Sequence, residues 1–422
     1  MKTQTKILID RLVGLPLAWL INLMSRFLGQ VLRRDHSIAP ENVRTIVFSK
    51  YLGMRSMIQA TPMIRSVRAA FPHARLIFVT GQSCRRMVER LEHIDQIITV
   101  DDRSVFRLVW TSARVLFQLM RARVDLYFDL ELYSAYSSLI AQCSLARNRL
   151  GFYRESAQHK RGNYTHLMFF NTRIPIRYIY LPLARLAGCE PVRPDTLGLI
   201  RVEPADRQEV ASRLATLGVG EVRRYLVINP NASDLLVERR WPTERFAQLI
   251  EQLIKRYDLP IILIGALADQ DHVSSVLQQV QGHGARVLNL AGTLSLGGLL
   301  ALLEGAACVV TNDTGPMHMA WALGARTVCL FGPVDPLHYG REGTGVELLH
   351  RPVYRSPCVH EVDLPPCNGN NICMHLIDVH TVLGAVERSL TKSGDRPGPK
   401  PLAVLLSDSF SQPLGRIVRG GV

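Results

Sequence analysis

Short apolar runs alternate with amphipathic helical stretches through most of this chain, and the alternation occurs in two separate blocks. In the first block, RTIVFS (44–49), ARLIFVTG (74–81) and QIITV (96–100) have the length and β-branched content of buried strands. A helical stretch, SVFRLVWTSARVLFQLMRAR (104–123), follows them, and VDLYFDLEL (124–132) is the next strand candidate. Strands that alternate with helices run parallel, so this block predicts a parallel α/β sheet.

The second block repeats the pattern with YLVINPN (225–231), LPIILIGA (259–266), CVVTND (308–313) and TVCLFGP (327–333) as strands. We therefore predict an α/β fold with two Rossmann-like, doubly wound domains that face a cleft. A ligand is expected at the carboxyl ends of their strands. The predicted segments are an amphipathic N-terminal segment (1–40), an N-terminal domain (41–195), a C-terminal domain (196–392) and a flexible tail (393–422).

Charge narrows the range of partners. The chain has 50 Lys and Arg against 36 Asp and Glu, a formal net charge of +14, which favours polyanionic partners. The basic residues are spread along the chain and no nucleic-acid-binding motif stands out, so we expect no nucleic-acid partner. An anionic membrane surface or a phosphate-bearing substrate remains, beside the alternative of a basic surface with no binding role.

Residues 12–32, LVGLPLAWLINLMSRFLGQVL, form an apolar run that Asn22 and Arg26 interrupt. A spanning helix requires about 20 mostly apolar residues without a central charge, and a secretory signal requires a small-residue cleavage site. Basic residues flank and interrupt this run, which is typical of a helix lying in the membrane interface. The alternative is an amphipathic helix packed on the protein itself.

The segment CVVTNDTGPMHMAWALG (308–324) has the pattern of an anion-binding turn. An apolar strand ends near Asp313, a tight turn contains Gly315 and Pro316, and a helix follows. The first N–H groups of a helix are unpaired and, with the helix dipole, attract a diphosphate. Gly315 lets a phosphate approach the backbone closely. The alternative is an ordinary helix cap formed by the side chain of Thr314 or Asp313.

The longer stretch NDTGPMHMAWALGARTVCLFGPVDP (312–336) resembles the signature of glycosyltransferase family 9, the family of lipopolysaccharide heptosyltransferases. Residues 56–76, 227–250 and 261–273 also resemble that family, in the same order. Ordered matches are more specific than one short pattern. A nicotinamide oxidoreductase is disfavoured, because SKYLGMRS (49–56) has no G-x-G-x-x-G after the first strand.

The resemblance implies a GT-B type fold with the donor in the C-terminal domain and the acceptor on the N-terminal side. It implies an inverting, metal-independent transfer without a cofactor. The donor would be a nucleoside-diphosphate sugar, such as an ADP-sugar carrying a heptose or a related sugar. The acceptor would be lipopolysaccharide core, a glycolipid or another envelope glycan. Such an enzyme is expected in the cytoplasm, peripherally associated with the inner membrane.

The chemistry needs fixed positive potential for the leaving diphosphate, which we expect from the backbone N–H groups around Gly315 to His318, with Arg239 or Arg240. Arg239 corresponds to a phosphate-binding lysine of the family, and an arginine can pair two phosphate oxygens in a planar fork. A surface arginine is the alternative. Asp313 corresponds to a family position near the donor sugar. The predicted donor-binding residues are Asn229, Asn231, Ser233, Arg239, Arg240, Asp313, Thr314, Gly315, Pro316, Met317 and His318.

The sequence departs from the family where the acceptor is deprotonated. Family members carry Gly-Asp early in the first helix, with that Asp as the expected base, whereas LGMRSMIQATP (52–62) has Arg55 and Ser56 there. A Ser hydroxyl without assistance is a poor base. The catalytic candidates are therefore Glu131 as first choice, then Asp129, both at the end of a predicted strand, and Ser56 itself. Capping of the next helix is the alternative for Glu131.

The departure from the family pattern also affects the roles of Arg55 and of the protein as a whole. Arg55 is assigned to an anionic group of the acceptor, such as a lipid-linked phosphate. The missing Asp also keeps a second function open, a non-catalytic relative that binds a sugar nucleotide or a partner without turnover.

Cys358, Cys367 and Cys373 cluster near His360 and His375. Their spacing is not the paired C-x-x-C of zinc sites. We expect a structural loop or a packing role, with a metal site or a disulfide as the alternative. No metal is predicted in the active site.

Overall fold

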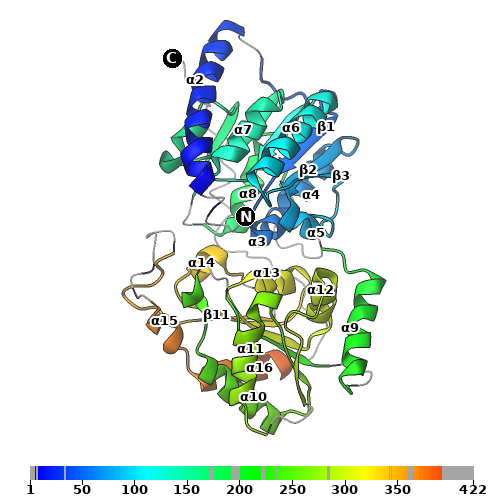
Figure 1. The fold of residues 1–422 in the computed structure, drawn as a ribbon, viewed down its shortest axis with the longest axis vertical. Helices are drawn as coiled ribbons and strands as arrows, with labels where there is room; N and C mark the ends of the chain where they lie inside the picture. The colour runs from blue at the N-terminus through cyan, green and yellow to red at the C-terminus, as the bar shows by residue number, and fades with distance from the viewer. Residues whose placement is uncertain are drawn as a thin grey trace.

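The computed structural model describes residues 5, 8–32, 35–171, 174–191, 200–219, 224–232, 236–282, 286–341, 343, 345–359, 365, 367 and 369–391. This part of the chain forms two lobes, each built on a six-stranded parallel sheet (Figure 1). The predicted α/β fold with two doubly wound domains is confirmed. The tail at 393–422 and the boundary near residue 195 lie outside the described residues, so the limits of the segments stay predictions.

The N-terminal sheet has the strand order β3-β2-β1-β4-β5-β6, with every neighbouring pair parallel. The chain reverses its direction of winding between β1 and β4, which makes a topological switch point, where open α/β sheets bind ligands outside the strand ends. The strands are β1 (Thr45–Ser49), β2 (Arg75–Gly81), β3 (Gln96–Val100), β4 (Leu126–Asp129), β5 (Asn148–Tyr153) and β6 (His166–Phe169).

The C-terminal sheet repeats this topology with the order β12-β11-β10-β7-β8-β9. Its switch point lies between β7 and β10. The strands are β7 (Leu226–Asn229), β8 (Ile261–Leu263), β9 (Val287–Asn289), β10 (Cys308–Asn312), β11 (Thr327–Phe331) and β12 (Val346–His350).

Helices connect the strands in both lobes. Those of the N-terminal lobe are α2 (Leu15–Leu32), α3 (Met54–Gln59), α4 (Thr61–Ala70), α5 (Arg85–Val88), α6 (Val105–Ala122), α7 (Ala135–Cys143) and α8 (Ile176–Arg185), with the short helical segments η1 (Asp10–Gly14), η2 (Pro40–Asn42), η3 (Gln82–Cys84) and η4 (Glu155–Lys160). Those of the C-terminal lobe are α9 (Pro204–Thr216), α10 (Thr243–Arg256), α11 (Gln270–Gln279), α12 (Leu296–Gly305), α13 (Gly315–Ala322), α14 (Pro336–Tyr339), α15 (Ile372–His375) and α16 (Val379–Thr391), with η5 (Val237–Arg239) and η6 (Leu267–Asp269).

Burial on both faces explains why the central strands read as unbroken apolar runs. All five residues of β1 are buried, and its register places Phe48 opposite Phe78 and Phe128. The rings of Phe48 and Phe128 stack with centroids 5.3 Å apart. The unpredicted strands β5 and β6 have polar residues within them, so only pairing with β4 and with each other makes them strands.

One predicted strand ends earlier than its sequence suggests. The strand predicted for residues 124–132 stops at Asp129, because the Asp129 carboxylate accepts a hydrogen bond from the N–H of Glu131 and turns the chain. Between β2 and β3 the chain forms only the short η3 and α5.

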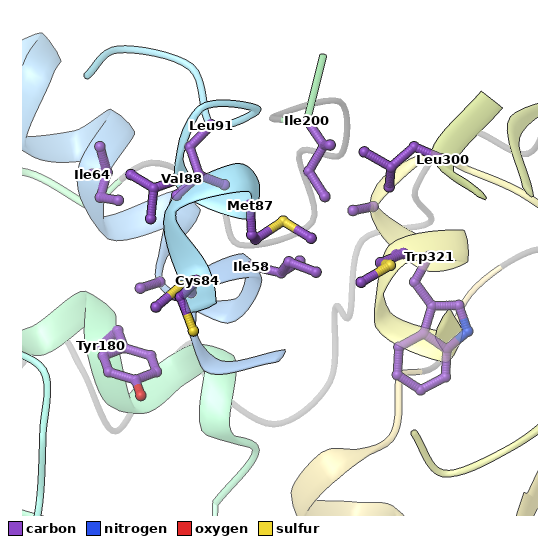
Figure 2. Packing of buried hydrophobic residues seen from close by; sticks show 14 of the residues in the cluster. Ile58, Ile64, Cys84, Met87, Val88, Leu91, Tyr180, Ile200, Leu300 and Trp321 are labelled. Atoms are coloured by element: carbon purple, nitrogen blue, oxygen red, sulfur yellow. The ribbon is translucent and has the colours of Figure 1, made fainter. Parts of the chain in front are cut away.

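The two lobes contact each other through apolar side chains (Figure 2). Met87 of α5 faces Leu300 of α12 and Trp321 of α13 across the boundary. Nearby, Arg90 donates two hydrogen bonds to Asp206, at 2.6 and 2.9 Å. These contacts hold the carboxyl edges of the two sheets close to each other.

The N-terminal segment is helical, as predicted. The helix over Asp10–Val31 is long and apolar enough to cross a membrane, by length and composition only. One side of α2 packs on α7, and the amide of Asn22 donates a hydrogen bond to the carbonyl of His159 at 2.6 Å. The other side is exposed, so the helix is both packed on the protein and available to a further contact.

Candidate active site

The two switch points meet at the boundary between the lobes. The chain leaves β1 and enters α3, and it leaves β10 and enters α13. Helices α3 and α13 pack against each other. The residues that follow the central strands of both sheets therefore share one site.

Asp313 follows β10 and lies buried at the centre of a charged cluster. Its carboxylate is 3.5 Å from Arg55 Nη1, 3.7 Å from Arg239 Nη1 and 3.8 Å from His318 Nε2. Arg239 also donates a hydrogen bond to the backbone carbonyl of Asp313 at 3.4 Å. Arg55 comes from the N-terminal lobe, and its guanidinium lies 4.0 Å from the ring centre of Tyr339. One carboxylate thus joins cationic groups from both lobes.

The cluster carries a net positive charge. Burial opposes ionisation of Asp313, but His318, Arg55 and Arg239 outweigh it and hold the pKa of this carboxyl well below its ordinary value. Burial, reinforced by the two arginines and opposed by Asp313, lowers the pKa of His318 to about 4. The imidazole is therefore neutral at pH 7. Two guanidinium groups then face one carboxylate, which leaves positive charge for an anionic ligand.

Buried atoms without partners also point to a ligand at this place. Asp313 Oδ2, Arg239 Nε and His318 Nε2 are buried and have no hydrogen-bond partner among the residues that the structure describes. Buried polar atoms are normally paired. A polar ligand that enters the cluster would supply the missing partners.

Helix α13 begins beside the cluster with its first N–H groups unoccupied by side chains. Its N-cap residue, Thr314, has an extended backbone, and no side chain of the described residues caps the helix. The alternative of an ordinary side-chain cap is therefore contradicted. A Cβ at Gly315 would meet only Met319 Cε within 4 Å among the described residues, at 3.9 Å. The space in front of Gly315 is open, as an anion site requires.

Two predicted donor-binding residues, Asn229 and Asn231, hold the loops of the C-terminal switch point in place. The Asn229 amide donates hydrogen bonds to the hydroxyls of Thr311 and Thr314, at 2.9 Å each. The Asn231 amide donates to Asn229 Oδ1 at 3.1 Å and to the carbonyl of Ile264 at 2.7 Å. Both side chains are buried beside the turn. Their direct contact with a donor stays a prediction.

The predicted residues around this turn do not all point to the cluster. Arg239 faces Asp313, whereas Arg240 donates a hydrogen bond to the carbonyl of Ala232 at 3.2 Å. The side chain of Met317 is fully buried in the core, so a ligand could contact this residue only through its backbone N–H. Ser233 lies outside the described residues.

Arg55 and Ser56 both lie on α3, at the positions where the family has Gly-Asp. Arg55 belongs to the N-terminal lobe, and its guanidinium reaches Asp313 of the C-terminal lobe. Burial raises the pKa of the Tyr180 phenol, and the Ser56 hydroxyl opposes that rise. No carboxylate replaces the missing Asp on this helix, which has the sequence MRSMIQ.

Sequence reasoning missed two residues of the cluster. Gln59 lies one helical turn after Arg55, and its amide nitrogen is 3.0 Å from His318 Nδ1. The i, i+4 spacing places it on the same face of α3 as Arg55, so the helical period could have found it. Tyr339 lies on α14, and only the tertiary structure brings its ring under Arg55.

Asp129, the second candidate base, is enclosed by hydrogen-bond donors. It is fully buried and accepts hydrogen bonds from Ser137 Oγ at 2.8 Å, from Lys160 Nζ at 2.9 Å and from the hydroxyl of Tyr164. A carboxylate without exposed surface offers no path to an acceptor hydroxyl. This placement indicates a structural role, as the counter-charge of the equally buried Lys160.

Glu131, the first candidate, lies at the same edge of the sheet with its side chain 12% exposed. It accepts hydrogen bonds from Lys50 Nζ at 2.6 Å and from the N–H groups of Tyr51 and Leu52, at 2.9 and 3.2 Å. The next helix, α7, is capped by Ser134, so the capping alternative for Glu131 is contradicted. Glu131 instead holds the loop that leads into α3.

The three clustered cysteines are free thiols. Cys358 and Cys373 are buried, and burial raises the pKa of the Cys373 thiol to about 11. Cys373 packs on Gly332, where a Cβ would lie 3.1 Å from its sulfur. Among the described residues no group of three His, Cys, Asp or Glu side chains is arranged to hold a metal ion, and His360 lies outside them. The packing of Cys373 supports the structural interpretation.

Comparison with known proteins gives the family. The family model for glycosyltransferase family 9 (heptosyltransferase) matches residues 113–367, more than half of the chain. The lipopolysaccharide heptosyltransferase 2 of Salmonella typhimurium is 34% identical over 99 residues, which cover 23% of this chain and 28% of that protein. The match therefore spans less than a third of that relative's length.

Two solved structures share the fold. The glycosyl transferase family 9 structure from Veillonella parvula superposes with a TM-score of 0.72 at 21% identity, covering 84% of this chain and 99% of that one. The E. coli heptosyltransferase WaaC with ADP superposes with a TM-score of 0.61 at 18% identity, covering 82% and 99%. Two parallel sheets with their switch points in contact, together with the family match over both lobes, lead to one conclusion: the chain belongs to glycosyltransferase family 9.

Proposed function

We propose that this protein is an inverting glycosyltransferase that transfers a heptose or a related sugar from a nucleoside-diphosphate sugar to lipopolysaccharide core or another envelope glycolipid. Family membership and the name of the Salmonella typhimurium relative support this assignment. The single observation that carries it is the convergence of Arg55, Arg239 and the open start of α13 on Asp313. The E. coli structure with ADP favours adenosine as the nucleoside.

The leaving diphosphate binds where the positive charge of this site is concentrated. Arg239 and the N–H groups of α13 bind the phosphate oxygens, and Arg55 closes on them from the other lobe. Donors that are already in place stabilise the charge that develops as the sugar–phosphate bond breaks, without reorganisation. Asp313 orients both guanidinium groups before the donor arrives. Because these cations supply the charge, the proposed transfer needs no metal.

Glu131 is our proposed base. Its three hydrogen bonds occupy three of the roughly four lone-pair positions of a carboxylate, so one position is free. That position accepts the proton of the acceptor hydroxyl as the hydroxyl oxygen attacks the anomeric carbon. The alternative is that Glu131 only positions the β1–α3 loop through Lys50 and the two amides. The two roles give different kinetics.

A pair of variants separates these roles. Glu131→Gln retains an oxygen for the loop amides but removes the basic carboxylate, so a base predicts a loss of kcat of about 100- to 10,000-fold with little change in KM. A positioning role predicts a mainly raised KM and an unchanged pH profile. Ser56→Ala is the matched control on α3, the helix that follows this loop. Ser56→Asp restores the family carboxylate and should rescue the Glu131→Gln variant.

The proposed function is tested by measuring binding of the donor nucleotide and acceptor-dependent release of ADP. A thermal-shift titration with ADP, UDP and GDP should raise the melting temperature most with ADP, by mass action. Adding a lipopolysaccharide acceptor that lacks its outer sugars, together with ADP-heptose, should release ADP. Binding of ADP-heptose without acceptor-dependent release would favour the second function, a non-catalytic sugar-nucleotide-binding relative, for which the missing Asp at Ser56 is the motivating observation.

We place the enzyme in the cytoplasm at the surface of the inner membrane, where a lipid-linked acceptor would be available. The apolar N-terminal helix and the net charge of +14 support this location.

A further inference from the structure

Helix α6 has two apolar stripes, although a surface helix of a soluble domain normally has one. The inner stripe includes Val115 and Leu119, which are buried against the sheet. The outer stripe includes Phe106, Trp110 and Phe117, which are 80%, 68% and 63% exposed. These residues recur at helical spacing on the solvent side. The outer stripe therefore has no partner within the described part of the chain.

Helix α2 is exposed in the same way. Ala18 and Asn22 of α2 follow Gly14 of η1 at intervals of four residues, and the three together form the buried side of this helical segment. The amides of Asn22 and Asn163 fix that side, because they donate hydrogen bonds to the carbonyls of His159 and Ala18. Most of its remaining surface is exposed, and large apolar side chains such as Leu20, Leu23 and Phe27 predominate there.

The two helices lie on the same side of the N-terminal lobe, with α7 between them (Figure 1). Both pack against α7. Asp10 accepts a hydrogen bond from the N–H of Tyr136 at 2.7 Å, and the phenol of Tyr136 lies 2.7 Å from Ser112 Oγ of α6. We call their exposed apolar surface the α2–α6 face. Its main residues are Leu20, Leu23, Phe27, Phe106, Trp110 and Phe117.

This face is a concentrated patch and not a scatter of single residues. More than half of the exposed large hydrophobic residues in the described chain lie in residues 8–31 or on α6. Soluble monomers rarely expose apolar surface in such a concentration, and where they do the patch marks an interaction site. Two helices that expose apolar side chains on the same side of the lobe are placed to contact one common partner.

The charges on the two helices identify that partner. Neither α2 nor α6 contains an Asp or a Glu, and both carry exposed arginines, namely Arg26, Arg107, Arg114 and Arg121. Apolar residues flanked by cations fit an anionic lipid bilayer. A second copy of this chain fits poorly, because pairing the face with itself brings Arg114 and Arg121 against other arginines, and neither helix contributes an acidic residue to offset them.

The tryptophans agree with a bilayer. Trp19 and Trp110 are 46% and 68% exposed on these helices, whereas Trp241 and Trp321 are buried in the cores. Trp is enriched at membrane–water interfaces, where its ring is apolar and its N–H reaches water.

We propose that α2 and α6 together dock this protein on the surface of an anionic bilayer, with both helices lying in the interface. The buried side of α2 is already committed to the lobe, so α2 lies on the membrane and does not span it. The proposal concerns a different face from the active site and does not depend on which sugar is transferred.

The full-length protein is tested by flotation with vesicles of phosphatidylcholine that contain 30% phosphatidylglycerol, compared with phosphatidylcholine alone. The phosphatidylglycerol vesicles should bind the protein and raised salt should weaken binding. Phe106→Glu/Trp110→Glu should abolish binding while α2 is intact. Arg114→Gln/Arg121→Gln should weaken it about 25-fold, since each arginine near an anionic surface contributes about fivefold. Leu267→Glu, at a residue 71% exposed on the other lobe, is the matched control.

The other outcomes overturn the proposal. Unchanged vesicle binding of Phe106→Glu/Trp110→Glu would remove α6 from the surface. Resistance to alkaline carbonate extraction would show that α2 spans the bilayer. Equal binding to both vesicle types, or a concentration-dependent dimer with no vesicle binding, would contradict an anionic bilayer as the partner. An unchanged melting temperature and an unchanged response to ADP show that each variant is folded.

Discussion

Replacing Gly315 by alanine should separate ligand binding from folding at the proposed diphosphate site. A Cβ there meets only Met319 Cε, at 3.9 Å, among the described residues, so the protein itself has room for it. Gly315 is the first residue of α13, and a helical Cα–Cβ bond tilts toward the helix N-terminus. The new methyl group would therefore project into the space where a phosphate oxygen approaches the backbone.

The two effects have opposite signs. An alanine in a conformation that it adopts without strain stabilises the fold by about 0.4–1 kcal/mol, because the unfolded chain has fewer conformations to lose. Loss of one charge-assisted hydrogen bond from an N–H to a phosphate costs about 1.5–3 kcal/mol, which weakens ADP binding about 10- to 100-fold. The variant should thus melt at the same temperature or slightly higher, and bind ADP much more weakly.

Isothermal titration with ADP and thermal unfolding without ligand measure both effects. Gly29→Ala is the matched control, because among the described residues no atom outside its own helix backbone and chain neighbours lies within 4 Å of a Cβ at Gly29, and this residue is far from α13 in the sequence. It should gain similar stability and keep its ADP affinity. Wild-type ADP affinity in Gly315→Ala would refute the anion site at the start of α13, whereas a strongly lowered melting temperature would refute the assumption of open space.

Three further predictions test the charged groups. Arg239→Gln should weaken ADP binding about 10- to 100-fold, whereas Arg240→Gln, at a side chain that points to Ala232, should leave titration with ADP nearly unchanged. Burial lowers the pKa of His318 from 6.5 to about 4, so between these pH values the unfolded chain binds a proton at this residue and the folded protein does not. The stabilisation is therefore complete above pH 6.5, and roughly 3 kcal/mol of the unfolding free energy is lost as the pH falls toward 4. The unfolding free energy of His318→Gln, measured by urea titration, should therefore fall less steeply over that range than that of the wild type. Asp129→Asn should destabilise the protein by about 3–5 kcal/mol, since it leaves buried Lys160 without its counter-charge, and a normal urea midpoint would contradict the pair.

Local patterns predicted most of the central strands and the turn at Gly315. A buried parallel strand needs apolar residues on both faces, so runs such as TIVFS can be recognised without knowledge of their neighbours. The peripheral strands β5 and β6 could not be recognised in this way, because their mixed sequences become strands only by pairing.

The roles of the two carboxylates at the end of β4 show where local reasoning stops. Sequence spacing places Asp129 and Glu131 at the same sheet edge, as the structure confirms. It does not reveal that Asp129 faces Lys160, which is 31 residues away, or that Glu131 binds the loop after β1, 80 residues away. Burial and partner choice depend on what packs above each side chain.

The sequence by itself determined the alternating strands and helices, the family motif and the anion-binding turn, because each rests on residues that are neighbours along the chain. The tertiary structure alone decided that Arg55 lies 3.5 Å from Asp313, 258 residues away, and that Gln59 contacts His318. It also decided which face of α2 is buried and left the outer stripe of α6 exposed. The physical reason is that periodicity encodes which side of an element is apolar, whereas only the packing of two lobes fixes which charges share a site and which apolar surface stays without a partner.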